Sequence, residues 1–318
     1  MNNKIIILKP RLDVPFKYAG EIPKEKGEIS KIRSYWEKFV RKLSSHYSSK
    51  GNDVEIIEKP LWQFDNQFVL KLSYSKIFIP HHCVKTFDES KRLTNVFYYM
   101  QMVFPWLFQV DNIGWCADAG VWPIKPSINC DQQIFKKYQN LCKQGLSKFP
   151  QPKRNQFINQ NKYILFLCQL PYDQTIKLHS DISVMDALIK TIKISISLGI
   201  QLIIKPHPLN KEAMRPFLEL AAKNNLTSNK YEILWAKTAN IHDLLEKCEA
   251  VFTVNSGGGM EAILHNKPVF CFGRSDYASV SHFITDSIDW QNKDKYISQY
   301  PNFLDAYVKS MIDVNDNI

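Results

Sequence analysis

Several absences narrow the class of protein to which this chain can belong. Its seven cysteines are scattered and form no Cys-x-x-Cys pair, so neither a zinc site nor a disulfide framework is indicated. No segment approaches the roughly 20 apolar residues that span a bilayer, and the apolar run within Met1–Leu8 is too short for a signal peptide. We therefore expect a reduced, cytoplasmic protein.

Nucleic-acid binding and metal chemistry also lack their usual signatures. The net charge is +10, but the basic residues are spread along the chain and form no stripe with interleaved aromatics. We expect no nucleic-acid partner, because a diffuse positive charge fits an anionic substrate or an anionic lipid surface at least as well. No Asp-x-Asp pair is present, so we expect no bound metal and no cofactor.

What the chain does have is enough apolar material for two domains. It holds 318 residues, of which 45% are hydrophobic and 13% aromatic. In the first half we expect strands and helices at the following residues: strands 4–8, 53–57 and 75–79, and helices 27–49 and 91–102. Residues 143–161 carry Gly145, Pro150 and many polar side chains, so we expect the domain linker there.

The second half alternates strands and helices, which predicts a parallel sheet covered on both faces. We expect the strands at 163–168, 200–204, 231–235, 250–254 and 269–272. We expect the helices at 180–197, 211–224, 241–247, 260–265 and 302–312. The predicted fold is therefore α/β, with two Rossmann-type domains (1–150 and 151–318) facing a cleft and a C-terminal helix that packs back, an arrangement similar to the GT-B architecture.

The most informative segment is a glycine turn between the strands at 250–254 and 269–272. Asn255 and Ser256 are typical N-cap residues, and Gly257 and Gly258 follow at once. A glycine turn that opens a helix gathers free amides at the positive helix end, which suits a phosphate, although an ordinary strand-to-helix turn would look the same. Glu261, one turn further on, is placed to accept the two hydroxyls of a ribose.

A second candidate follows the strand at 163–168, where the sequence runs Gln169-Leu-Pro-Tyr-Asp173. In a parallel sheet, side chains just beyond this end of a strand line the usual ligand crevice. A carboxylate there can serve as a nucleophile, a general base or an acceptor for sugar hydroxyls. The alternative is that Asp173 only caps a turn.

A third candidate, Lys205-Pro-His207-Pro, follows the strand at 200–204. The two prolines restrict the backbone and would present Lys205 and His207 rigidly. A rigid basic pair at a strand end suits a phosphate or a carboxylate, whereas a lone buried histidine is more often structural. Two further residues, Arg274 and Tyr277, follow the next strand and would face the same edge of the sheet.

In the first half, four residues are candidates for acceptor binding or for acid–base chemistry. They are His81, His82, Asp111 and Asp118. Two adjacent histidines do not make a metal site without a third ligand.

With these residues in view, the chain resembles the capsule-polysaccharide biosynthesis proteins that act as retaining β-Kdo glycosyltransferases. The resemblance is carried by these segments, in chain order: Asp111–Trp115, Gln169-x-x-x-Asp173, Lys205-Pro-His-Pro, Asn255–Glu261 and Gly273–Tyr277. It implies a GT-B-like fold, a CMP-Kdo donor, a glycan or glycolipid acceptor and no metal. It further implies a cytoplasmic protein, with peripheral association at the inner membrane left open.

The resemblance also implies site roles. Asp173 would be the nucleophile of a double displacement, which retains configuration through a covalent glycosyl-enzyme. His207 and Lys205 would stabilise the departing phosphate or the Kdo carboxylate, and Ser256 with the glycine amides would hold the phosphate. A sialyltransferase-like enzyme, another GT-B nucleotide-sugar enzyme or a non-catalytic subunit of a polysaccharide assembly complex remain alternatives.

Overall fold

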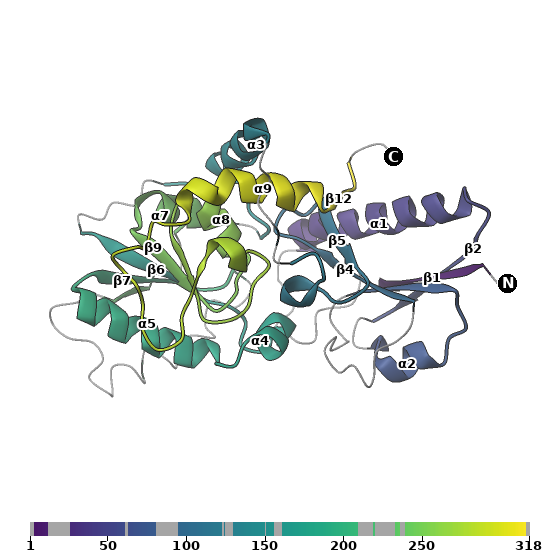
Figure 1. Cartoon of the computed structure of the whole chain (residues 1–318), viewed down its shortest axis with the longest axis horizontal. Coiled ribbons are helices and arrows are strands. Elements are labelled where there is room, and N and C mark those ends of the chain that lie inside the picture. The colour runs from purple at the N-terminus through teal and green to yellow at the C-terminus, as the bar shows by residue number, and fades with distance from the viewer. Residues whose placement is uncertain are drawn as a thin grey trace. The chain divides into compact units, whose positions relative to one another are not determined.

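The structure is a computed structural model of the whole chain (Figure 1). It describes residues 3–11, 26–60, 63–80, 95–122, 124, 130–149, 151–155, 161–208, 219, 233–235 and 239–315. The chain forms two compact units: one ends at Trp122 and resumes at Val308, and the other runs from Pro123 to Tyr307. We call them the first and the second unit.

The first unit is built on a six-stranded sheet. Its strands are β1 (Lys4–Pro10), β2 (Asp53–Lys59), β3 (Lys76–Pro80), β4 (Val96–Gln101), β5 (Leu107–Asp111) and β12 (Ile312–Asp313), in the order β12-β5-β4-β3-β1-β2. The strands β1 to β4 are mutually parallel, whereas β5 runs antiparallel to β4 and β12 antiparallel to β5. Helices α1 (Lys26–Ser48) and α2 (Asn66–Leu70) lie on opposite sides of this sheet (Figure 1).

An aromatic core joins α1 to the sheet of the first unit. Phe39 of α1 stacks on Phe108 of β5 with ring centroids 4.4 Å apart, and it contacts Tyr99 of β4 at 4.9 Å. Trp36, one helical turn earlier, donates its indole N–H to the buried Gln101 side chain at 2.9 Å. The apolar residues of α1 thus recur on one face, as the sequence period predicted.

The second unit carries a fully parallel six-stranded sheet. Its strands are β6 (Tyr163–Leu167), β7 (Gln201–Lys205), β8 (Ile233–Trp235), β9 (Ala250–Thr253), β10 (Val269–Cys271) and β11 (His282–Phe283), in the order β11-β10-β9-β6-β7-β8. Counted along the chain from β8 inward, this is the 3-2-1-4-5-6 order of a doubly wound dinucleotide-binding sheet. The sequence-based α/β assignment is therefore confirmed.

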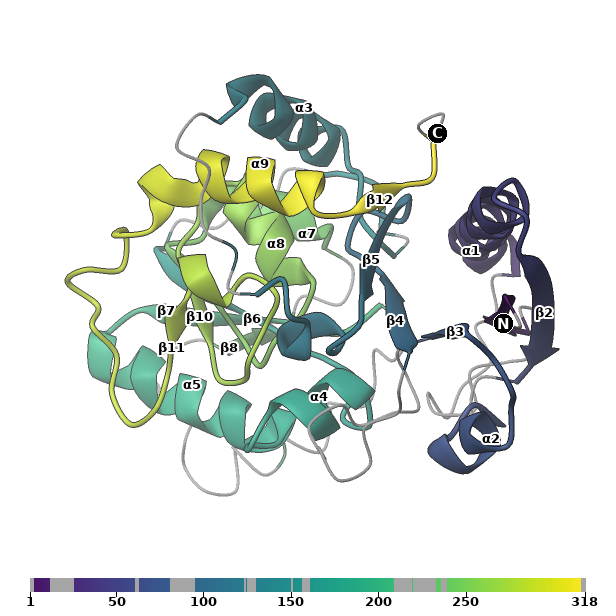
Figure 2. The ribbon, with the colours of Figure 1, turned by 45° about the vertical axis from the view of Figure 1, so that its right-hand side comes forward.

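Helices cover both faces of this second sheet. They are α3 (Gln132–Lys143), α4 (Gln174–His179), α5 (Val184–Leu198), α7 (Ile241–Lys247), α8 (Gly258–Leu264) and α9 (Tyr300–Lys309). In two views, α4 and α5 lie on one side of the sheet, and α3, α7, α8 and α9 on the other (Figure 2). The core under α5 consists of strand side chains such as Ile164, Phe166 and Phe252, all fully buried.

The predicted helix at 91–102 is wrong in its described part, because residues 96–101 form strand β4. Phe97, Tyr98 and Tyr99 are good strand formers, and the pairing with β3 and β5 on either side satisfies the backbone. The Tyr99 hydroxyl also donates to the Leu8 carbonyl at 2.5 Å. Tertiary pairing thus overrides a helix-like period.

The predicted helix at 180–197 is in fact two helices. Ser180 is the extended residue that ends α4, and Ser183 caps α5 by accepting the Asp186 amide at 3.1 Å. Gly199 ends α5 at φ +66°, a left-handed conformation that suits glycine, as expected. The final helix stops at Lys309, earlier than predicted, because Ile312 and Asp313 pair with β5. The predicted helix at 211–224 lies outside the described residues except for residue 219.

The division of the chain into units differs from the expected boundary at residue 150. Helix α3 and the segment after it belong to the second unit, and the residues after Tyr307 return to the first. The cause is visible in the hydrogen bonds, since Leu146, Arg154 and Asn155 bond to side chains of α7. Among the described helices, none is long and apolar enough to cross a bilayer.

Replacing Phe39 by alanine should open a cavity in the first unit, because the ring is 1% exposed, stacks on Phe108 and contacts Tyr99. We expect a loss of about 3–5 kcal/mol in unfolding free energy. Hydrogen exchange should show faster exchange of β1 and β4 amides with β6 unchanged.

The control for this prediction is Leu70→Ala, since Leu70 is 69% exposed and should change stability by less than about 0.5 kcal/mol. Equal exchange rates in the two variants would contradict the core assignment.

Candidate active site

The candidate site lies in the second unit, where its winding reverses. Strand β6 pairs with β7 on one side and with β9 on the other, so the connections from β6 and from β9 leave in opposite directions. In doubly wound sheets the ligand crevice opens at the carboxyl ends of the strands at this reversal. The segments that follow β6 and β9 there contain Gln169 and Asn255, two of the residues predicted from sequence.

Gln169 and Asn255 tie these two segments together. Gln169 Nε2 donates to Asn255 Oδ1 at 2.8 Å, and Gln169 Oε1 accepts the Asn255 amide at 2.9 Å. Asn255 Nδ2 in turn donates to the carbonyls of Thr175 and Arg274, at 2.9 and 3.2 Å. Both side chains are buried, so in this state they position the loops after β6, β9 and β10. Contact of either with a nucleotide sugar stays a prediction.

Asp173 begins helix α4, and the capping alternative for this residue holds in the structure. Its Oδ1 accepts both the Thr175 amide and the Thr175 hydroxyl at 2.9 Å. The side chain is only half-buried, and its negative charge raises the pKa of His207. Asp173 therefore lies near the predicted basic pair, and its part as a nucleophile stays a prediction.

The basic pair follows β7 as expected, but its two members differ in charge. Lys205 is the last residue of the strand and is 4% exposed. Burial lowers the pKa of His207 to about 4, an effect that the attraction of Asp173 only partly offsets. At neutral pH the imidazole is thus neutral, and Lys205 supplies the positive charge.

The glycine turn after β9 is partly closed by its own hydrogen bonds. Ser256 Oγ accepts the Gly258 amide at 3.1 Å, and the Ser256 carbonyl accepts the Gly259 amide at 2.9 Å. A phosphate at the Gly258 amide would therefore have to displace the serine hydroxyl. Phosphate binding by Ser256, Gly257 and Gly258 stays a prediction.

The third glycine of the turn has a packing cause. A Cβ on Gly259 would lie 2.2 Å from the Tyr277 hydroxyl, which is too close for any side chain. The Tyr277 ring is fully buried, and its hydroxyl donates to the Ser256 carbonyl at 2.6 Å. In this state Tyr277 packs against Gly259 and fixes the turn through its bond to Ser256. Arg274, by contrast, is exposed and donates to the Leu178 carbonyl at the end of α4.

Glu261 of α8 is 4% exposed and is directed toward the segment after α3. Its carboxylate accepts hydrogen bonds from the Ser147 side chain and the Lys148 backbone, while Oε1 has no partner among the described residues. Burial raises the pKa of Glu261 to about 7, against these two hydrogen bonds. Ribose binding by Glu261 stays a prediction.

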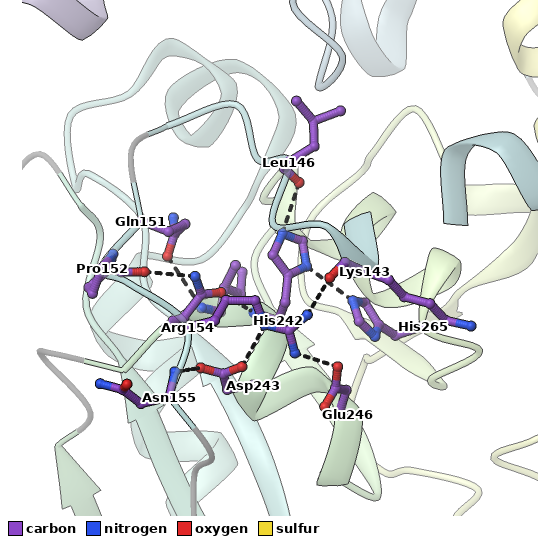
Figure 3. A network of polar contacts seen from close by, with 12 residues as sticks. Lys143, Leu146, Gln151, Pro152, Arg154, Asn155, His242, Asp243, Glu246 and His265 are labelled. Carbon is purple, nitrogen blue, oxygen red and sulfur yellow. Dashed lines mark hydrogen bonds and ion pairs between the residues drawn. The ribbon is translucent and has the colours of Figure 1, made fainter. Parts of the chain in front are cut away.

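A polar network that the sequence did not indicate holds residues 143–155 on α7 (Figure 3). Arg154 Nε donates to Asp243 at 2.7 Å, Nη2 pairs with Glu246, and Nη1 donates to the Lys143 carbonyl. His242 contacts the Leu146 carbonyl at 2.8 Å through Nε2. Sequence reasoning missed this, because Gly145 and the polar residues read as a linker, and the partners lie nearly 90 positions away.

His242 and His265 form an imidazole pair in the same network, with Nδ1 and Nε2 3.0 Å apart. Burial lowers the pKa of His242 to about 4, and burial together with His242 lowers the pKa of His265 to about 3. Both rings are therefore neutral at neutral pH, and the pair is a structural contact.

Of the four candidates in the first half of the chain, the structure describes two, Asp111 and Asp118. Asp111 organises the loop after β5: its Oδ1 accepts the amides of Ile113 and Gly114, and its Oδ2 accepts that of Val121. Both oxygens of Asp111 are thus engaged with backbone amides in this state, and its role in acceptor binding or acid–base chemistry stays a prediction. Asp118 is 5% exposed in the short 3₁₀ turn Cys116–Asp118. The two other candidates, His81 and His82, lie outside the described residues. Within the part of the chain that is described, no three His, Cys, Asp or Glu side chains gather as metal ligands.

Replacing Glu261 by glutamine should change how stability depends on pH. The raised pKa means that the folded protein binds a proton that the unfolded chain releases between about pH 4.5 and 7, so wild-type stability falls across that window. Relative to wild type, Glu261→Gln should gain stability as pH rises, by at most about 3 kcal/mol at pH 8. Melting curves from pH 5 to 8 measure this difference, with the exposed Asp181→Asn as control. A constant difference across that range would contradict the raised pKa.

Comparison with known proteins agrees with this geometry. A match of 122 residues, 29% identical, relates the chain to the capsule polysaccharide export protein KpsS of Escherichia coli. It covers 36% of this chain and 31% of the relative, so the chain spans about a third of that protein's length.

Two solved structures of KpsC from Thermosulfurimonas dismutans share the fold. The one described as a beta Kdo 2,4 transferase has a TM-score of 0.54 at 13% identity, covering 96% of this chain and 90% of that chain. The one described as a beta Kdo 2,7 transferase has a TM-score of 0.50 at 15% identity, covering 93% and 90%. At such identities the likeness establishes the α/β, GT-B-like fold.

The family model described as "Capsule polysaccharide biosynthesis protein" matches residues 129–314. This match covers more than half of the chain, including the whole second sheet, its switch point and the basic pair after β7. The chain therefore belongs to the family of capsule polysaccharide biosynthesis proteins.

Proposed function

We propose that this protein is a glycosyltransferase of bacterial surface-polysaccharide synthesis, and more narrowly a retaining β-Kdo transferase that uses CMP-Kdo. The observation that carries the proposal is the grouping of Asp173, His207 and Ser256 beyond the carboxyl ends of three adjoining strands, β6, β7 and β9. Membership of the capsule family and a fold shared with two proteins described as Kdo transferases support the same reading.

The proposed reaction is a double displacement at the anomeric carbon of Kdo. The Asp173 carboxylate attacks that carbon, the bond to the phosphate oxygen breaks, and CMP leaves with the bonding electrons. The acceptor hydroxyl then attacks the same carbon from the opposite face, loses its proton to a general base and releases Asp173. Because Oδ1 is held by Thr175, the other oxygen is the one that attacks. For the base, His81, His82, Asp111 and Asp118 stay candidates.

The charges of the basic pair fit an anionic donor. Lys205 is positive and buried, so its attraction for a phosphate or the Kdo carboxylate is screened little by water. The neutral His207 can donate one ring N–H to the leaving phosphate without adding charge. Arg274 at the exposed rim adds a further cation. These groups supply the charge that a metal ion provides in other transferases, so the proposal includes none.

Binding of CMP is the first consequence to measure. CMP at about 100 times its dissociation constant should stabilise the protein by roughly 2.7 kcal/mol, which thermal unfolding detects. UMP, UDP, GDP and ADP serve as controls, all without added metal. A shift with UDP or GDP alone would retire the CMP-Kdo donor while keeping a nucleotide-sugar enzyme, and no shift with any of them would favour a non-catalytic subunit.

Asp173→Asn should separate the nucleophile from the cap. Asparagine caps helices about as well as aspartate, so the fold and CMP binding should persist. Transfer from CMP-Kdo should fall by roughly 10³-fold or more, since an amide cannot form the glycosyl-enzyme.

The matched control for this variant is Asp181→Asn, an exposed aspartate eight positions along the chain. It should keep wild-type transfer. Near-normal transfer by Asp173→Asn would remove Asp173 from the role of nucleophile.

A further inference from the structure

The segment Leu146–Phe149, just after α3, is fixed to two helices of the second unit, α7 and α8. The Leu146 carbonyl contacts His242 of α7 at 2.8 Å, and the Ser147 side chain and the Lys148 amide hydrogen-bond to Glu261 of α8. Three residues before Leu146, the Lys143 carbonyl accepts Arg154 Nη1 at 2.5 Å. A segment expected to be a linker is therefore held at defined points, and we call it the strap.

The strap ends against the candidate site. The Phe149 ring packs edge-on against the His207 imidazole, with ring centroids 5.1 Å apart. His207 follows β7, so this contact joins the strap to the carboxyl end of the sheet. An edge-on aromatic contact restricts how the imidazole can turn, and it removes water from one side of the ring.

Lys148 is the third residue of the strap, and its charge acts on groups from three other segments. Its charge lowers the pKa of His207 after β7, of Glu261 in α8 and of Asp276 after β10. The side chain is half-buried, so it keeps a path to solvent. Lys205 acts on His207 in the same sense, which places two cations around one imidazole.

We propose that the strap is part of the ligand site, with Lys148 binding an anionic group of the ligand beside Lys205 and Phe149 fixing the His207 ring. Glu261 acts here as a positioning residue, because its bond to the Lys148 amide holds the backbone from which the ammonium extends. The inference rests on the proposed function in taking the anionic group to be the phosphate or carboxylate of the sugar donor. The chemistry itself requires only a phosphate or carboxylate.

The test compares Lys148→Met with Lys153→Met, an exposed lysine five positions along the same segment. Calorimetry measures the dissociation constants of CMP and of inorganic phosphate, and thermal unfolding without ligand measures stability. We expect Lys148→Met to weaken binding about tenfold or more, the usual effect of losing one charge-assisted hydrogen bond, while Lys153→Met binds as wild type.

A second variant separates binding from a purely structural role. Phe149→Leu keeps apolar volume but loses the edge-on contact, so the His207 ring should respond. NMR titration, with the His207 signal assigned by His207→Asn, should show a raised pKa for His207 in Phe149→Leu and in Lys148→Met, and no change in Lys153→Met. A lysine that served only as a counter-ion to Glu261 would alter stability without altering affinity.

The outcomes distinguish this inference from the proposed function. Unchanged affinity in Lys148→Met would overturn the inference and leave the CMP-Kdo proposal standing. If wild type binds phosphate but not CMP, and Lys148→Met loses that binding, the inference stands and the CMP-Kdo donor fails. If wild type binds neither probe, the strap holds no such anion and the inference is overturned.

Discussion

The parallel pairing of β6 with β9 is the contact on which the candidate site depends. These strands are more than 80 residues apart, yet their pairing makes β6 the point from which the sheet winds both ways. It brings Gln169 against Asn255, whose three side-chain hydrogen bonds then fix the loops after β6, β9 and β10. Each of these buried amides satisfies the other, so removing one would leave buried polar groups without partners.

Residues of the candidate site serve both the fold and the proposed chemistry. Asp173 caps a helix and is at the same time proposed to react, since only one of its oxygens carries the described capping bonds. Burial lowers the pKa of His207, which keeps the imidazole neutral, and raises the pKa of Glu261, which favours its protonated form. The site therefore buries fewer charges than the number of its ionisable residues suggests. Around His207 the remaining charges are the two cations Lys205 and Lys148 and the carboxylate of Asp173.

The strap is held by contacts that do not involve the strands of the second sheet. Its anchors are the contact of Leu146 with His242 of α7 and the bonds of Ser147 and Lys148 to Glu261 of α8, and Arg154 holds the neighbouring Lys143 carbonyl against α7. Residues between these anchors are free to differ in charge or size at small cost to the fold. Specificity placed on a loop that a rigid scaffold supports is a common arrangement.

The sequence by itself determined the α/β class, eight of the twelve described strands, helices α1 and α7 and the motifs at the strand ends, because these follow from local periodicity and from turn residues. The sequence did not predict β5, β11 or β12. It missed β4, whose aromatic run becomes a strand only when β3 and β5 flank it, and it placed the domain boundary in a segment that long-range bonds hold to α7. Only the tertiary structure decided that Tyr277 leaves no room for a side chain at Gly259, that Glu261 bonds the strap and that Phe149 packs against His207. Each of these depends on residues distant in the chain, and local pattern carries no record of which distant partner a side chain will meet.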